Sequence, residues 1–384
     1  MSTMNTQLKY GMVGGGPGAF VGPVHRHAIR LDDSATLVAG CFSSDPAKNK
    51  VASAELHIGD DRTYADYAEM AAAESRRSDG IDFVVVVTPN HLHFPICEAF
   101  LLAGIHVVCD KPLALTKEEC VRLMALSKEK NLLFMVTYTY TGNVTVREAR
   151  ELIAAGRIGR IRMVAAEYPQ SWLASPDQDG GKQGLWRRDP AQSGRVNALG
   201  DIGTHIENLV SYVTQLEIRR LLAKMDVLVP GRVLDDNDMV LLEYTNGASG
   251  MYWCSQVAFG QINGLRLRVF GDKGSLFWSQ ENSEELILNT DTGRTEILRR
   301  GGDRISPAAA RFQRTPAGHA EGWLEAMANL YVAYTETLRD VKSGNPIPTT
   351  PNFPTAADGV AGLSFVEACL ESQANGSVWV DIAT

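Results

Sequence analysis

The chain has 384 residues, a formal net charge of −8 and a pI near 5.6, and 45% of its residues are hydrophobic. This length allows about two domains, each with a packed core. The acidic balance, without a basic stripe, argues against a nucleic-acid-binding protein. No apolar run approaches the roughly 18 residues that a membrane helix needs, and residues 1–9 lack the apolar core of a signal peptide. We therefore expect neither nucleic-acid nor membrane partners.

The cysteines give an expectation about the compartment. No two of them form a C-x-x-C pair, and several lie in apolar runs, which is typical of reduced, buried thiols in a cytoplasmic protein. They are Cys41, Cys97, Cys109, Cys120, Cys254 and Cys369. We therefore expect a cytoplasmic location and no disulfides.

In the first part of the chain, strand patterns alternate with helix patterns. The expected strands are residues 9–13, 36–42, 81–88, 105–109 and 133–137. The expected helices are residues 21–31, 45–56, 93–103 and 116–130. Such alternation implies right-handed crossovers and a parallel sheet. We therefore predict an α/β doubly wound nucleotide-binding domain, of the Rossmann type, over residues 1–137.

The rest of the chain, residues 138–384, has a different pattern. Expected helices cover residues 146–155, 201–214, 322–342 and 359–372. Expected strands cover residues 161–168, 221–229, 239–244, 248–256, 265–270, 275–278 and 285–289. Turn signals such as Asn246-Gly247 join several of these strands directly. We predict an α+β domain with a mostly antiparallel sheet.

A glycine-rich turn follows the first expected strand and precedes the first expected helix. In this context backbone N–H groups and the helix N-terminus bind the pyrophosphate of a dinucleotide. Gly14 and Gly16 supply the first two glycines. The third position falls on Ala19 with the usual spacing or on Gly22 in a longer loop, and the run of glycines favours the longer loop. The turn predicts NAD or NADP as cofactor.

The end of the second strand bears on the choice between these two cofactors. Dinucleotide-binding domains place an acid there for the adenosine ribose. Here Phe42 or Ser43 takes that position, and Asp45 comes later. The hydroxyls of Ser43 and Ser44 are able to donate to a 2′-phosphate, but no arginine is adjacent. The sequence leaves the choice between NAD and NADP open.

The segment from Thr88 to His93 follows the central strand. Ligands of a parallel sheet bind outside the carboxyl ends of its strands, so Asn90 and His93 are candidates to contact nicotinamide or its ribose. The alternative is that the histidines cap and pack. His91 and His93 form an H-x-H pair, but no carboxylate or cysteine lies nearby at ligand spacing, so we expect no metal.

Three further groups carry acid–base potential. Lys111 follows the strand over residues 105–109 and shares the sheet edge of the glycine turn, although a solvated lysine is the alternative. Asp201 and His205 lie four residues apart, on one face of a helix. A carboxylate beside an imidazole orients it and raises its basicity. The alternative is a surface pair or a packed histidine.

Other residues are candidates to contact a substrate. Trp186 and Arg187 precede the expected helix over residues 201–214, and their aromatic and cationic groups suit a hydroxyl-rich ligand. His319 is a possible further contact, with capping as the alternative.

Taken in order, these motifs resemble those of the Gfo/Idh/MocA oxidoreductases, which include inositol 2-dehydrogenase and glucose–fructose oxidoreductase. The motifs are the glycine-rich turn, Thr88-Pro89-Asn90-x-x-His93, Asp110-Lys111-Pro112, Gly156-Arg157-Ile158-Gly159 and Gly200-Asp201-x-Gly203-x-His205. The likeness runs through nearly the whole chain. Asp110 stands where the family usually has glutamate, and the glycine loop is longer than usual.

The resemblance implies an N-terminal Rossmann domain and a C-terminal domain whose open antiparallel sheet builds a homodimer or homotetramer. It implies that Lys111, Asp201 and His205 are catalytic and that the substrates are sugars, sugar derivatives or cyclitols. We therefore expect an NAD(P)-dependent dehydrogenase that acts on a secondary hydroxyl of such a molecule.

Two alternatives remain at this stage. An NAD-dependent glycosidase or epimerase would begin with the same oxidation but retain its cofactor. A non-catalytic NAD(P)-sensing regulator has no need of the lysine, aspartate and histidine, yet all three are present. The sequence does not identify the sugar, the carbon oxidised or the physiological direction, nor does it distinguish a dimer from a tetramer.

Overall fold

The computed structural model describes residues 7–175, 184 and 186–382. The chain forms two compact units. Unit 1 comprises Met1–Thr137 and Met327–Val360, and unit 2 comprises Tyr138–Ala326 and Ala361–Thr384. A late segment of the chain therefore folds with the first unit. The division of functions between residues 1–137 and 138–384 stays a prediction.

Unit 1 is built on a five-stranded parallel sheet in the order β2-β1-β3-β4-β5, which confirms the predicted doubly wound architecture. The strands are β1 (Leu8–Gly14), β2 (Ala35–Cys41), β3 (Phe83–Val87), β4 (His106–Cys109) and β5 (Phe134–Val136). Every residue of β3 is buried, as its run of valines requires in a sheet covered on both faces. The strand order reverses between β1 and β3, and such switch points bind ligands.

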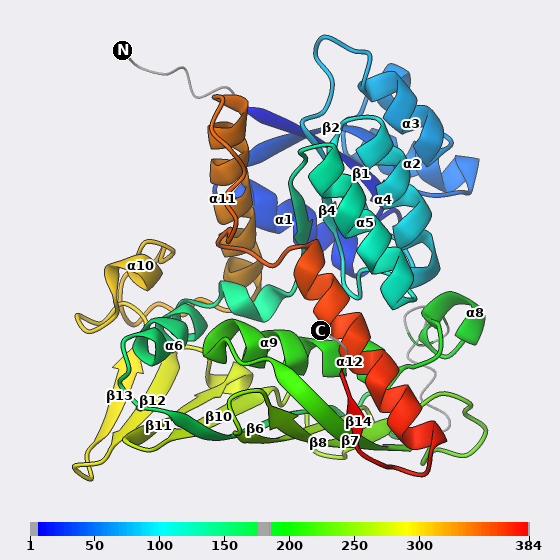
Figure 1. Cartoon of the computed structure of the whole chain (residues 1–384). Coiled ribbons are helices and arrows are strands. Elements are labelled where there is room, and N and C mark those ends of the chain that lie inside the picture. Colours follow the sequence, from blue (N-terminus) through cyan, green and yellow to red (C-terminus); the bar gives the residue numbers. More distant parts are fainter. Residues whose placement is uncertain (1–6, 176–183, 185, 383–384) are drawn as a thin grey trace. The chain divides into compact units, whose positions relative to one another are not determined.

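Helices cover both faces of this sheet. They are α1 (Val21–Leu31), α2 (Pro46–Glu55), α3 (Tyr67–Glu74), α4 (His93–Leu102) and α5 (Lys117–Glu129), with short turns η1 (Asp60–Arg62) and η2 (Asn90–Leu92). Figure 1 shows α1 on one face together with α11 (Trp323–Lys342), which belongs to unit 1 from Met327 onward, and α2 to α5 on the other. The Tyr334 ring of α11 lies edge-on to Phe83 of β3, with 5.3 Å between ring centroids.

Unit 2 is built on a nine-stranded sheet in the order β13-β12-β11-β10-β6-β9-β8-β7-β14. The strands are β6 (Ile161–Pro169), β7 (Ile218–Asp226), β8 (Asn237–Tyr244), β9 (Ser249–Ser255), β10 (Arg266–Gly271), β11 (Gly274–Ser279), β12 (Glu285–Thr290), β13 (Thr295–Arg299) and β14 (Val380–Asp381). Neighbouring strands are antiparallel except β6 and β9, which are parallel. The predicted mostly antiparallel sheet is confirmed.

Helices and short helical turns precede, follow or connect the strands of unit 2. They are η3 (Thr139–Gly142), α6 (Val144–Ala154), α8 (Pro190–Ser193), η4 (Leu199–Gly203), α9 (Thr204–Thr214), η5 (Gln280–Asn282), α10 (Pro307–Ala310) and, from Ala361 onward, α12 (Ala356–Ala374). Figure 1 shows α6 and α9 lying along the sheet. The opposite face exposes apolar side chains such as Leu241 and Met251. Within the described part of the chain, no helix combines the length and apolar character that crossing a bilayer requires.

One expected helix, over residues 201–214, is divided in the structure. Its first part, Leu199–Gly203, is a π-helical turn, and the α-helix proper begins only at Thr204. Gly203 has little space around it: a β-carbon there would lie 2.9 Å from Cδ1 of Leu199 and 3.3 Å from Sγ of Cys254. This close packing favours glycine in the wider turn. Periodicity alone does not distinguish a π turn from an α-helix.

Candidate active site

The glycine-rich turn of unit 1 occupies residues 14–20, between β1 and α1. Gly14, Gly15 and Gly18 have φ values of 85°, 74° and 75°, which side chains rarely adopt. The N–H of Gly16 donates to the carbonyl of Phe42 at 3.1 Å, and a β-carbon on Gly16 would lie 2.6 Å from that oxygen. At these positions the backbone favours glycine, so the turn presents backbone atoms without side chains.

The start of α1 shows how the third glycine is used. Ala19 lies in the turn, where its N–H donates to Gly16 O at 3.0 Å, while Gly22 lies within the helix. A β-carbon on Gly22 would lie 2.4 Å from Cα of Gly15, so this glycine lets helix and turn pack together. Among the described residues no side chain caps this helix, and the N-terminus of a helix is a favourable place for an anion. This geometry fits a dinucleotide pyrophosphate and suits the longer loop.

At the end of β2, the carboxylate of Asp45 has a structural partner. It caps α2 by accepting the N–H of Ala47 at 2.9 Å and of Lys48 at 3.3 Å. These hydrogen bonds, that from Lys48 first, lower the pKa of Asp45. The Ser43 hydroxyl accepts the N–H of Asp45 at 3.2 Å, and Ser44 is exposed. Ser43 and Ser44 thus lie where a ribose acid is usual, and neither carries a charge.

The segment after β3 places His93 in the interior. This imidazole is 1% exposed, and its Nδ1 and Nε2 lie 2.8 Å from Pro112 O and 2.9 Å from Thr88 O. Burial lowers the pKa of His93, against the opposing influence of Asp110 and these two carbonyls. His93 therefore braces the turn that carries Lys111. A direct contact between His93 and a cofactor stays a prediction, as does one from the buried Asn90.

Lys111 follows β4 at the sheet edge where the carboxyl ends of the strands lie. Its backbone N–H donates to Oδ1 of Asp110 at 2.8 Å, and the Thr137 hydroxyl donates to the same oxygen at 3.0 Å. The Asp110 carboxylate thereby links the segment that follows β4 to the segment that follows β5.

In unit 2, Asp201 lies in the π-helical turn and His205 at the start of α9. Oδ2 of Asp201 accepts a hydrogen bond from Gln256 Nε2 at 2.9 Å and lies 3.2 Å from Nε of Arg187. The Arg187 guanidinium lies over the Trp186 ring, 4.4 Å from its centroid. The structure thus brings the predicted residues Trp186, Arg187 and Asp201 together through direct contacts. Most of the polar loop between Ser171 and Gly184 lies outside the described residues.

Three tyrosines surround the buried imidazole of His205. The ring centroids of Tyr138, Tyr140 and Tyr168 lie 5.7, 5.0 and 6.1 Å from that of His205. The Tyr140 and Tyr168 hydroxyls hydrogen-bond to one another, and Tyr168 donates to Asn263 Oδ1 at 2.7 Å. Burial raises the pKa of Tyr140 and of Tyr168, which keeps both phenols neutral. The sequence analysis did not identify this aromatic enclosure.

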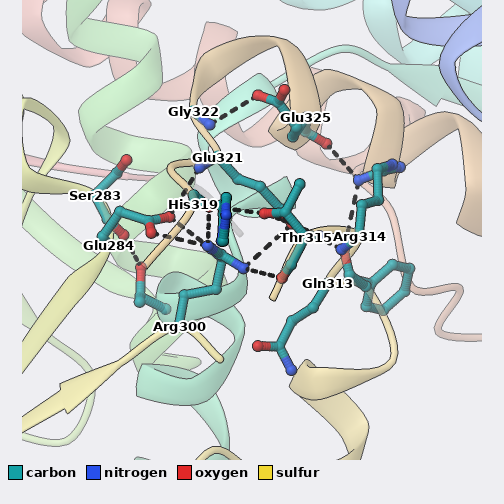
Figure 2. Close-up of polar contacts among 12 residues, drawn as sticks. Ser283, Glu284, Arg300, Gln313, Arg314, Thr315, His319, Glu321, Gly322 and Glu325 are labelled. Carbon is teal, nitrogen blue, oxygen red and sulfur yellow. Dashed lines mark hydrogen bonds and ion pairs between the residues drawn. The ribbon is translucent and has the colours of Figure 1, made fainter. Parts of the chain in front are cut away.

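His319 lies at an exposed turn in a different polar cluster of unit 2, shown in Figure 2. Its carbonyl accepts hydrogen bonds from the Arg300 guanidinium and, at 2.7 Å, from the Thr315 hydroxyl. Arg300 is buried and pairs with Glu284 at 2.6 Å and with Glu321 at 3.2 Å. This network fixes the backbone of the turn, and a substrate contact by the His319 imidazole stays a prediction.

Most of the chain matches models of known protein families. Residues 8–138 match the model of an oxidoreductase family with an NAD-binding Rossmann fold, and residues 146–277 match the GFO/IDH/MocA C-terminal domain. The chain belongs to the Gfo/Idh/MocA family. It is 34% identical to the uncharacterized oxidoreductase YfiI of Bacillus subtilis, over 97% of this chain and 96% of that protein. The predicted family and the oxidoreductase class are confirmed.

Two similar proteins are linked by name to a sugar derivative or a cyclitol. The levoglucosan dehydrogenase of Pseudarthrobacter phenanthrenivorans is 28% identical over 98% of both chains. A crystal structure of an inositol dehydrogenase homolog from Azotobacter vinelandii, complexed with NADH and myo-inositol, is 36% identical, covers 98% of this chain and 97% of its own, and has a TM-score of 0.92. The glycine turn predicts a dinucleotide cofactor, and the family that the chain belongs to binds NAD. This prediction is confirmed.

Proposed function

We propose that this protein is an NAD(P)-dependent dehydrogenase that oxidises a secondary hydroxyl of a sugar, a sugar derivative or a cyclitol. The observation that supports this proposal most is the buried imidazole of His205, one turn from a carboxylate that is itself hydrogen-bonded and ion-paired. A positioned imidazole of this kind accepts a hydroxyl proton. Relatives named as inositol and levoglucosan dehydrogenases indicate the substrate class.

In the proposed reaction each catalytic residue has one task. His205 accepts the hydroxyl proton, which typically contributes about 10²–10⁴-fold in rate. Asp201 orients His205 or binds a neighbouring hydroxyl of the substrate. Lys111 donates a hydrogen bond to the developing alkoxide, and such charge stabilisation is worth about 3 kcal/mol. The nicotinamide, when bound, supplies the acceptor for the hydride.

The first part of the chain, residues 1–137, would bind the dinucleotide. The proposed contacts come from the glycine turn, the end of β2 and the segments after β3 and β4. They are Gly14, Gly16, Ala19, Gly22, Ser43, Ser44, Thr88, Asn90, His93 and Lys111. Since Ser43 and Ser44 are uncharged and Asp45 caps α2, either NAD or NADP would be accepted.

Residues 138–384 would bind the substrate and assemble the oligomer. Trp186, Arg187 and His319 are the proposed substrate contacts beyond the catalytic groups. A homodimer or homotetramer would form through the face of the nine-stranded sheet opposite α6 and α9, where a row of paired residues runs across seven strands. This row is Leu241, Met251, Ala165, Arg268, Phe277, Ile287 and Ile297. The cytoplasm is the proposed location, since the six cysteines are buried and unbridged.

The experiment that tests this function is a substrate panel. Cyclitols, hexoses, glycosides and anhydrosugars are each incubated with the protein and NAD or NADP, and reduced cofactor is followed at 340 nm. We expect substrate-dependent reduction with at least one polyol. Product formation without net reduced cofactor would instead support a glycosidase or epimerase, and nucleotide binding without any turnover would support a sensor.

A further inference from the structure

A chain of buried hydrogen bonds in unit 2 leads to the carboxylate of Asp201, and it begins at Asp235. The two carboxylate oxygens of Asp235 accept the N–H of Asn197 at 2.6 Å and of Leu199 at 2.7 Å. The backbone carbonyl of Asp235 accepts the Asn197 side-chain amide at 3.1 Å. Asp235 thus holds the backbone and the side chain of Asn197 and the backbone of Leu199, where the π-helical turn begins.

Gln256 connects Asn197 to Asp201. Its Oε1 accepts from Asn197 Nδ2 at 2.9 Å, and its Nε2 donates to Asp201 Oδ2 at 2.9 Å. The Gln256 backbone N–H donates to Asp236 O, also at 2.9 Å. Both side-chain amides are buried, at 2% exposure for Asn197 and 0% for Gln256. Neither amide is free to exchange these partners for water.

These hydrogen bonds can run in only one direction. A backbone carbonyl only accepts, so Asn197 must turn its NH₂ group toward Asp235. That NH₂ group also faces Gln256, which must then present its oxygen to Asn197 and its nitrogen to Asp201. Asp201 is left to accept, and an ionised carboxylate only accepts. This chain of hydrogen bonds therefore favours the ionised form of Asp201.

Other charged and titratable groups also face Asp201. Arg187 forms an ion pair with it, which likewise favours the carboxylate. His205 follows one turn later, and the charge of Asp201 contributes to the raised pKa of both Tyr140 and Tyr168. The Arg187 side chain is partly exposed, whereas Gln256 lies in the buried interior.

We propose that Gln256 is a positioning residue, which holds the carboxylate of Asp201 ionised and fixed in place one helical turn before His205, the residue that takes the substrate proton. This inference rests on the proposed dehydrogenase function. It assigns a role to Gln256 and, behind it, to Asn197 and Asp235. A glutamine that served only packing would be replaceable by a side chain of the same size.

The first test compares Gln256→Leu with the wild type. Losing a hydrogen bond to a charged group typically costs about 1.5–3 kcal/mol, so we expect kcat to fall about 10- to 100-fold. KM for the dinucleotide should stay unchanged. Ser372→Ala is the matched control, since it removes buried hydrogen bonds to Ala223 and Val378 in the same unit. The control should lower the melting temperature and leave kcat unchanged. A Gln256→Leu enzyme with wild-type kcat would overturn the proposal.

A second variant tests the direction of the hydrogen bond from Gln256 to Asp201. In Gln256→Glu, a protonated glutamic acid is still able to donate to Asp201, whereas an ionised one faces it as a second carboxylate. Because His205 itself needs to be neutral, the variant is compared with the wild type at each pH. We expect its activity relative to the wild type to be highest at the acidic end of the range and to fall as the pH rises and the new carboxyl ionises. A pH profile of the same shape as that of the wild type would contradict the claim that Gln256 donates to Asp201.

A third measurement does not depend on turnover. The side-chain carboxyl of Asp201 is followed by ¹³C NMR during a pH titration, with Asp201→Asn used to assign its signal. In Gln256→Leu the midpoint should move to higher pH, because the ionised form has lost a donor. An unchanged midpoint would overturn the proposal. Failure of the dehydrogenase proposal would show separately, as a wild-type protein that oxidises no polyol.

Discussion

Single residues in the glycine turn are constrained by the backbone around them. Gly16 lies against the carbonyl of Phe42, and pyrophosphate would approach the same stretch of backbone. We predict that Gly16→Val lowers NAD(P) affinity by about tenfold or more, which corresponds to 1.4 kcal/mol. Isothermal titration calorimetry measures the affinity, and a melting curve checks that the fold survives. Wild-type affinity in a folded variant would exclude the turn from the cofactor site.

Cofactor choice is also a property of single residues. Ser43→Asp would place a carboxylate where a ribose acid is usual, and an aspartate is still able to accept the N–H that Ser43 accepts from Asp45. The new charge would bind ribose hydroxyls and repel a 2′-phosphate. We predict a higher ratio of kcat/KM for NAD over NADP than in the wild type. An unchanged ratio would show that the end of β2 does not face the ribose.

Sequence patterns identified the motif residues but not every side chain around them. Asp201 and His205 were found because carboxylate and imidazole recur at helical spacing beside glycines. The tyrosine enclosure was missed because Tyr140 and Tyr168 come from separate elements, and only the folded sheet brings their hydroxyls together. Gln256 was missed for the same reason. An amide 55 residues from Asp201 gives no periodic signal.

At the scale of elements, most of unit 1 could be predicted, since each strand and helix there has its own local signal. Thr116 is an example: its capping box with Glu119 begins α5. Elements with weak patterns were not foreseen, such as α3, whose first turn follows a capping Asp66, and the short edge strand β13. The π-helical turn at Leu199–Gly203 reflects tertiary packing of glycines, which local propensity does not encode.

A buried acidic cluster at the start of β8, formed by Asp235, Asp236 and Asp238, makes a prediction about pH. Burial, and then the charge of Asp235, raises the pKa of Asp238 well above its ordinary value of 3.8. The folded protein therefore retains a proton that the unfolded chain releases. The stability that this proton contributes is complete below pH 3.8 and is lost as the pH rises through the folded-state pKa.

Asp238→Asn tests this cluster. The amide needs no proton to stay neutral, so we predict that the melting temperature of the variant falls less between pH 5 and pH 8 than that of the wild type. Scanning calorimetry across this range measures the difference. Parallel curves for the two proteins would show that Asp238 does not retain a proton in the folded state.

At the scale of the whole molecule, the sheet face opposite α6 and α9 predicts the oligomeric state. Leu241 and Met251 are paired across β8 and β9, and each is nearly half exposed. Since burying an unpaired charge is costly, the double variant Leu241→Glu, Met251→Glu should dissociate the proposed oligomer. Light scattering after size exclusion should then give a mass near 41.8 kDa. Val233→Glu, in the β7–β8 loop, is the control, and an unchanged mass of the double variant would place the interface elsewhere.

The central claim is that Lys111 and His205 carry out polyol oxidation. The measurement that tests it most directly is kcat with the best panel substrate for Lys111→Ala and His205→Ala, beside dinucleotide affinity and the exposed control Lys128→Ala. Because both residues act mainly in the transition state, kcat should fall by about 10²-fold or more in each variant while nucleotide still binds. The control should match the wild type. A fully active Lys111→Ala or His205→Ala enzyme would contradict this account.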